Sequence, residues 1–121
     1  MTFKMQIALD VYLDKIREDY RQGYKGRMDN ATSVKMIKEF ENGLIIKKGK
    51  KYLKVVVERI EGGSRVHSFI SLGGDKFKEG DILLPETWFR PAKNKARGNI
   101  YEDYQIKWTG PDYLPTGLQK Q

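Results

Sequence analysis

The chain has 121 residues, no cysteine, a single histidine and a formal net charge of +7 from 23 basic and 16 acidic side chains. The lack of cysteine excludes disulfides, thiolate metal sites and cysteine nucleophiles, and one histidine excludes multi-histidine metal sites. The positive charge favours a polyanionic partner such as nucleic acid, an acidic protein face or an anionic lipid surface, although solubility alone would also account for it.

Two helices are predicted in the first third of the chain. The first has apolar residues at spacings of four, three and four, the period of one helical face. These residues are Leu9, Leu13, Ile16 and Tyr20. Gly23 and Gly26 are expected to end this helix. A shorter second helix is predicted to begin with Asn30 or Thr32 as its N-cap and to stop at Asn42-Gly43.

The remainder of the chain is typical of an antiparallel meander. Strands are predicted at residues 44–46, 52–60, 65–72 and 82–84, separated by turns that contain glycine. Pro85 is expected to end the fourth strand. From Trp108 onward the glycine and proline residues indicate an extended segment, with residues 115–121 as a frayed tail.

The expected class is therefore α+β in one domain spanning residues 1–121. One or two N-terminal helices precede an antiparallel sheet of four or five strands, which could curl into a small open barrel. No uncharged apolar run approaches the roughly 20 residues of a membrane span, and residues 1–10 lack the apolar core of a signal peptide. We therefore expect a cytoplasmic protein without membrane association.

Residues that could support catalysis are few. His67, next to Ser68 on a predicted strand, is more typical of a packed or surface histidine than of a general base. No glycine cluster has the spacing of a P-loop or a dinucleotide-binding turn. Metal-dependent nucleases and glycosidases need only carboxylates, and such an enzyme is the alternative. We predict a non-enzymatic protein with no catalytic residue, no metal and no cofactor.

Lysines crowd the first predicted hairpin. They are Lys47, Lys48, Lys50 and Lys51, with Lys54 following in the next strand. Two interpretations remain open for this cluster. The lysines could contribute to a binding surface, or they could only shield an exposed sheet edge from pairing with other chains.

The segment from Trp88 to Tyr101 is the strongest candidate for a binding loop. It holds four basic residues and no acidic one: Arg90, Lys93, Lys95 and Arg97. Arginine can bind phosphate through two hydrogen bonds, lysine adds charge, and an aromatic ring can stack on an unpaired base. Four other residues are interpreted as the scaffold that holds the loop, with Trp88 in the core. They are Trp88, Gly98, Asn99 and Tyr101.

Several short motifs occur together in this chain. They are W-x-x-P-A-x-N-x-x-R-G-N from Trp88 to Asn99, W-T-G-P from Trp108 to Pro111, and the stretches 80–83, 40–44 and 50–55. In combination they resemble a family of small bacteriophage proteins, with the similarity covering roughly residues 36 to 114. The resemblance implies a phage-encoded protein made in the host cytoplasm. It implies no activity and no site residue.

The leading hypothesis is an accessory protein that binds DNA or RNA, mainly through phosphate contacts from the basic loop. Two alternatives use the same loop or the same small fold. One is a protein-binding module whose basic loop engages an acidic surface of a host enzyme or a virion component, because Trp, Tyr and Arg are also common in protein interfaces. The other is a minor virion structural protein.

Overall fold

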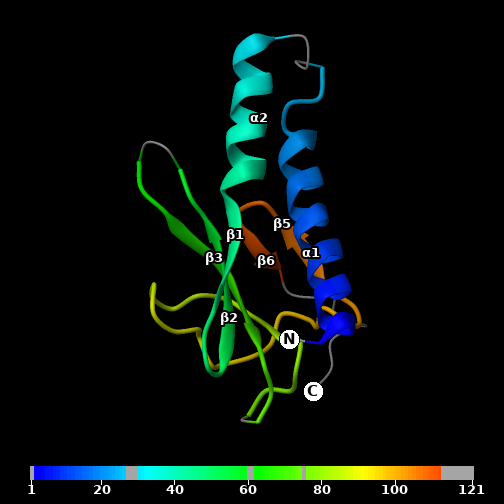
Figure 1. Ribbon diagram of the computed structural model, residues 1–121, viewed down its shortest axis with the longest axis vertical. Coiled ribbons are helices and arrows are strands. Elements are labelled where there is room, and N and C mark those ends of the chain that lie inside the picture. Colours follow the sequence, from blue (N-terminus) through cyan, green and yellow to red (C-terminus); the bar gives the residue numbers. More distant parts are fainter. Residues whose placement is uncertain (1, 27–29, 60–61, 75, 113–121) are drawn as a thin grey trace.

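The computed structural model describes residues 2–26, 30–59, 62–74 and 76–112. Two helices, α1 (Phe3–Gln22) and α2 (Ala31–Gly43), lie side by side and precede the strands (Figure 1). The main sheet has the antiparallel order β1-β2-β3-β4, with strands β1 (Leu44–Lys48), β2 (Tyr52–Val57), β3 (Arg65–Ser71) and β4 (Ile82–Leu83). This arrangement confirms the predicted α+β class. Among the described residues the sheet does not close into a barrel.

The predicted apolar face of α1 is confirmed. The Thr2 side chain caps the helix by accepting a hydrogen bond from the Met5 backbone N–H at 3.1 Å. The buried face comprises Met5, Leu9, Tyr12, Leu13, Ile16 and Tyr20, and Gly23 is the C-cap. Within the described part of the chain, neither helix combines the length and apolarity that crossing a membrane requires.

The second helix runs into the sheet without a linker. Asn30 is the N-cap, as predicted, and its side chain accepts a hydrogen bond from the Thr32 N–H at 2.8 Å. Gly43 is the last helical residue and Leu44 the first strand residue, so the predicted stop is also confirmed. The Gly43 carbonyl accepts a hydrogen bond from the Glu58 N–H at 2.7 Å, which ties the junction to the end of β2.

The two faces of the main sheet are covered differently. One face carries Leu53, Ile70 and Ile82 in adjacent register and packs against α1 in the larger hydrophobic core. The opposite face carries Phe69 and Leu83, which form a smaller core with Phe77. A loop, rather than a third helix, follows β4 over this second face, and its Ala96 packs against the smaller core.

A second hairpin is formed by β5 (Gln105–Lys107) and β6 (Gly110–Asp112), so part of the extended segment predicted from Trp108 is a paired strand. The hairpin is held by tertiary contacts at its turn. The backbone N–H of Trp108 donates to the Asp19 carboxylate at 2.9 Å. The Trp108 ring meets the Tyr20 ring edge-on, with 5.2 Å between their centroids. The predicted tail, residues 115–121, and the predicted end of the second strand, residue 60, lie outside the described residues.

His67 is the extra residue of a β-bulge in β3. Val55 pairs with Ser68 and Val56 with Val66, so His67 has no partner of its own on β2. A bulge turns a side chain away from strict alternation, and here it allows the neighbouring side chains of His67 and Ser68 to meet. The His67 Nδ1 and Ser68 Oγ atoms lie 2.9 Å apart, and both residues are buried. His67 is thus packed in the interior.

The bulge anchors a buried chain of hydrogen bonds. The Lys107 carbonyl lies 2.7 Å from His67 Nε2 and can only accept, so Nε2 carries the proton of the neutral ring. His67 Nδ1 must then accept from the Ser68 hydroxyl, which leaves Ser68 Oγ to accept from the Tyr12 hydroxyl at 2.6 Å. The network joins α1, β3 and β5. Burial raises the pKa of the Tyr12 phenol and keeps it protonated as a donor.

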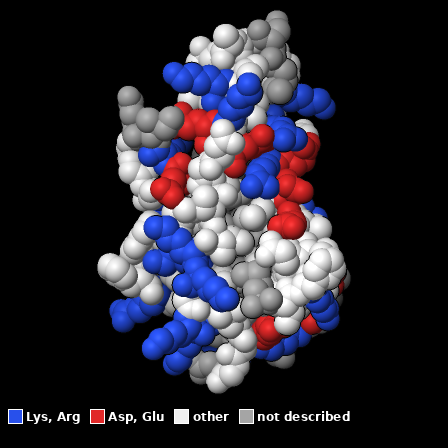
Figure 2. All heavy atoms as spheres, viewed as in Figure 1, with Lys and Arg blue, Asp and Glu red and all other residues white. Residues whose placement is uncertain are grey.

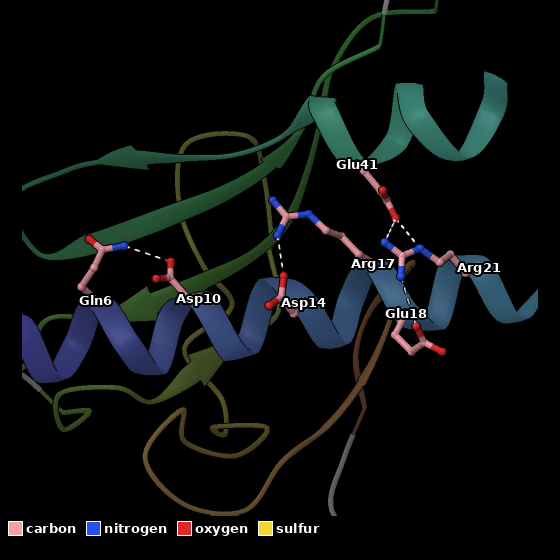
Figure 3. A network of polar contacts seen from close by, with 7 residues as sticks. All are labelled: Gln6, Asp10, Asp14, Arg17, Glu18, Arg21 and Glu41. Carbon is pink, nitrogen blue, oxygen red and sulfur yellow. Dashed lines mark hydrogen bonds and ion pairs between the residues drawn. The ribbon is translucent and has the colours of Figure 1, made fainter. Parts of the chain in front are cut away.

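Polar contacts along the exposed side of α1 include one that links it to α2 (Figure 3). The Arg21 guanidinium donates to the Glu41 carboxylate of α2 at 2.6 Å through Nε and also reaches Glu18. Exposed ion pairs of this kind contribute about 0 to 1 kcal/mol. The helix pair is held more firmly by the parallel stack of Tyr20 on Phe40, whose ring centroids lie 4.0 Å apart.

Candidate nucleic-acid interface

The basic hairpin and the basic loop meet on the face of the sheet opposite α1. Lys47 and Lys54 are direct partners on β1 and β2, so both side chains project from this face. The Lys54 Nζ lies 4.5 Å from the centroid of the Trp88 ring and 5.7 Å from that of Phe89, and the Lys47 Nζ lies 5.9 Å from Trp88. We call Lys47, Lys54, Trp88 and Phe89 the lysine–aromatic surface.

A tight turn of residues 85–91 presents the two aromatic rings. Its ends are joined by an isolated bridge between Pro85 and Pro91, and the Thr87 N–H donates to the Arg90 carbonyl at 3.1 Å. Inside the turn, the Thr87 hydroxyl accepts hydrogen bonds from the Phe89 N–H at 3.1 Å and the Arg90 N–H at 3.3 Å. These bonds fix the backbone of the turn, while the Phe89 ring at its tip is 84% exposed.

The placement of Lys47 opposite Lys54 is electrostatically unfavourable in the free protein. Like charges directly opposite each other on neighbouring strands are destabilising. The pKa of Lys54 is lowered, first because the ammonium is partly desolvated and second because of the Lys47 charge. Contact with the Trp88 ring offsets part of this cost through cation–π attraction. A bound anion would relieve the repulsion and raise the Lys54 pKa.

Basic side chains are prominent around this surface. In the view of Figure 2, Lys and Arg side chains gather over the left of the lower part of the molecule, with Asp and Glu side chains visible to their right, and the upper part also carries both signs. Lys93 extends the basic surface along β2, because its Nζ lies 5.9 Å from the centroid of the Tyr52 ring. The Lys76 ammonium donates to the carbonyls of Lys93 at 2.8 Å and Asn94 at 3.4 Å, and so braces this part of the loop.

The other predicted contact residues of the loop differ in their exposure to solvent. Arg90 is exposed and forms an ion pair with Glu86 at 3.1 Å. Lys95 and Arg97 are half-buried. The backbone N–H of Arg97 donates to the Ile82 carbonyl at 2.7 Å. These three residues therefore differ in how readily a partner can reach their charges.

The lysines of the first hairpin do not all project from the same face of the sheet. Lys48 pairs with Leu53, whose side chain faces α1, so Lys48 projects to the side of the sheet away from the lysine–aromatic surface. Lys50 and Lys51 lie in the exposed turn between β1 and β2. Lys47 and Lys54 are the members of this group that meet the Trp88 ring within the described part of the chain.

Gly98, Asn99 and Tyr101, which were predicted to be scaffold residues, make close contacts within the folded chain. The buried Asn99 amide donates to the Glu79 carbonyl and to the Asp81 carboxylate, both at 3.0 Å, and accepts from the Tyr101 N–H at 2.9 Å. Gly98 has a φ of 135°, and a Cβ there would lie 2.6 Å from the Asp103 carbonyl oxygen. These contacts tie residues 98–101 to Glu79 and Asp81.

The predicted core position of Trp88 needs correction. The Trp88 side chain is half-buried and lies against the ammonium groups of Lys54 and Lys47. The physical reason is the short turn closed by Pro85 and Pro91, which carries its tip outward from the sheet. Trp88 therefore belongs to the candidate interface.

Lys76 and Tyr52 were not predicted as site residues, and Lys54 was predicted only as a member of the hairpin cluster. A signal for Lys54 was present, because a hairpin turning at residues 49–51 pairs residue 47 with residue 54. Lys76 follows the turn glycines Gly73-Gly74 and has no motif around it. Its role depends on the path of the loop after β4, which only the folded chain reveals.

Chemically, the lysine–aromatic surface offers cationic groups beside aromatic faces. Among the described residues, no group of three or more His, Asp or Glu side chains is arranged to hold a metal ion. The surface is suited to recognising a ligand that combines negative charge with flat, unsaturated rings.

A protein-family model described as a family of unknown function, DUF7717, matches residues 3–113. The chain belongs to this family. No curated protein and no solved structure matches the chain. The DUF7717 match begins at the first residue of α1 and runs past β6, so it includes both hydrophobic cores and the whole lysine–aromatic surface.

Proposed function

We propose that this DUF7717 protein is a non-enzymatic accessory protein that binds nucleic acid through the lysine–aromatic surface. The observation that carries the proposal is the Lys47–Lys54 pair, held beside the Trp88 ring with the exposed Phe89 adjacent. Nucleic acids supply both the phosphates that lysines attract and the base faces that aromatic rings attract. A phage origin is supported by the motifs at residues 88–99 and 108–111.

The contact residues have distinct roles in this proposal. Lys47 and Lys54 bind phosphates, and the repulsion between the two ammonium groups is relieved on binding. Lys93 extends the phosphate path along β2. Arg90 joins by exchanging its exposed ion pair with Glu86 for a phosphate, an exchange that costs little because both partners are solvated.

The salt dependence of binding gives the first test. If about four phosphates are neutralised, affinity for DNA or RNA falls roughly a hundredfold between about 50 and 200 mM salt. Fluorescence anisotropy with labelled single-stranded and duplex oligonucleotides measures this slope. Absence of binding to every one of these probes, or binding that does not respond to salt, would overturn the proposal and favour a protein partner.

The double substitution Lys47→Ala/Lys54→Ala tests the location. Loss of two phosphate contacts is expected to weaken binding about thirtyfold near physiological salt and to reduce the salt slope by about 1.5 to 2. The matched control is Lys35→Ala/Lys38→Ala, which removes the same charge from two exposed lysines of α2. Equal losses in the two variants would mean that net charge, rather than this surface, drives binding.

A further inference from the structure

We propose that the ligand of the lysine–aromatic surface is an unpaired stretch of nucleic acid, with one base stacked on the Phe89 ring. This inference rests on the proposed function and adds the strandedness of the partner and the residue that selects it. Its basis is the juxtaposition of a highly exposed aromatic ring with a lysine pair on a turn whose backbone is fixed.

Phe89 is held in an exposed position that folding alone does not explain. Its ring is 84% exposed, so burial in the core contributes little to its retention at the tip. The turn bonds to Thr87 and the Pro85–Pro91 bridge fix the backbone that carries it. Because this backbone is already ordered, a ligand that stacks on the ring has to restrict only the Phe89 side chain.

Trp88 is less suited to be the stacking platform. Its side chain is half-buried, and the Lys54 ammonium lies 4.5 Å from the ring centroid. The same ammonium lies 5.7 Å from the Phe89 centroid, close to the upper limit of about 6 Å for a cation–π contact. Trp88 therefore positions Lys54, and the neighbouring ring of Phe89 receives the base.

The chemistry of phenylalanine favours an unpaired base over a duplex. Phenylalanine has no hydrogen-bonding group with which to read base edges in a groove, so its contribution is an apolar face. Bases inside a duplex already stack on their neighbours, whereas a single strand offers free faces. A base on Phe89 would bring its phosphates close to the ammonium of Lys54, so stacking and charge act on the same nucleotide.

Three probes of equal length separate stacking from charge. They are a labelled oligothymidylate of roughly 20 nucleotides, an abasic strand with the same phosphates and a duplex. We expect the oligothymidylate to bind roughly tenfold more tightly than the abasic strand, and also more tightly than the duplex at equal salt. Oligouridylate in a parallel titration shows whether DNA or RNA is preferred. Equal affinities for oligothymidylate and the abasic strand would overturn the inference but leave the proposed function intact.

The substitution Phe89→Ala assigns the effect to one ring. It is expected to weaken oligothymidylate binding roughly tenfold and to leave abasic-strand binding unchanged, while Phe89→Trp retains tight binding. Phe3→Ala is the matched control, because Phe3 is 82% exposed but lies on α1. If Phe89→Ala and Phe3→Ala behave alike, Phe89 is not the stacking residue. If no probe binds to the native chain, the proposed function itself fails.

Discussion

Replacing Gly43 by alanine is expected to destabilise the protein by roughly 3 kcal/mol, because the junction between α2 and β1 has no room for a side chain. A Cβ on Gly43 would overlap the carbonyl oxygen of Glu58, whose N–H donates to the Gly43 carbonyl. The obstacle is backbone, so a rotamer change cannot relieve it. Chemical denaturation measures the loss as a lower midpoint with an unchanged slope.

Gly23→Ala is the control for this substitution. Gly23 also stands at the end of a helix, but its φ is −66°, and an added Cβ would meet only the Tyr20 carbonyl at an ordinary distance of 3.4 Å. Alanine restricts the unfolded chain more than glycine does, so Gly23→Ala is expected to be neutral or slightly stabilising. Equal destabilisation by the two substitutions would contradict the steric explanation for Gly43.

Acid is expected to destabilise the protein through His67. Burial lowers the pKa of His67 from 6.5 to about 4; the hydrogen bond to the Lys107 carbonyl opposes this shift and the Arg65 charge adds to it. Because the unfolded chain takes up the proton first, the free energy of unfolding falls as the pH drops from 6.5 towards 4. The full contribution, about 3 kcal/mol, is present above pH 6.5.

The substitution His67→Gln isolates this contribution. Glutamine has both an amide donor and an acceptor, so it can replace part of the buried network, but it does not titrate. Urea denaturation at several pH values is expected to show a smaller loss of stability between pH 6.5 and 4 in His67→Gln than in the native chain. Parallel pH profiles for the two proteins would show that other groups cause the acid sensitivity.

Much of the fold was predictable because local signals and packing agree. The apolar spacing of α1 matches the face that it buries, Asn30 has the side chain that an N-cap requires, and glycines mark the turns. The second hairpin was not predictable in the same way. Only Ile106 is apolar in β5, and Pro111 within β6 argues against a strand unless that strand needs no N–H there. Tertiary contacts of Trp108 position this hairpin.

Two features, one in the core and one in the candidate site, could be found only in the folded chain. Strict alternation along β3 places the side chains of His67 and Ser68 on opposite faces, and the bulge that brings them together leaves no mark in the residue pattern. The position of Trp88 beside Lys54 depends on how the loop after β4 crosses the sheet. By contrast, Gly98 could be assigned to the loop scaffold from the sequence, because glycine readily adopts the positive φ that it has in the structure.

The closure of the turn at Pro85 and Pro91 separates residues with different folding costs of substitution. Outside the turn, Gly98 and Asn99 are tied to backbone groups and to Asp81, so most substitutions there carry a folding cost. Phe89 at the tip of the turn is exposed and contributes little to the core, so its replacement carries little folding cost. The tip of this turn can therefore be altered experimentally while the architecture beneath it stays the same.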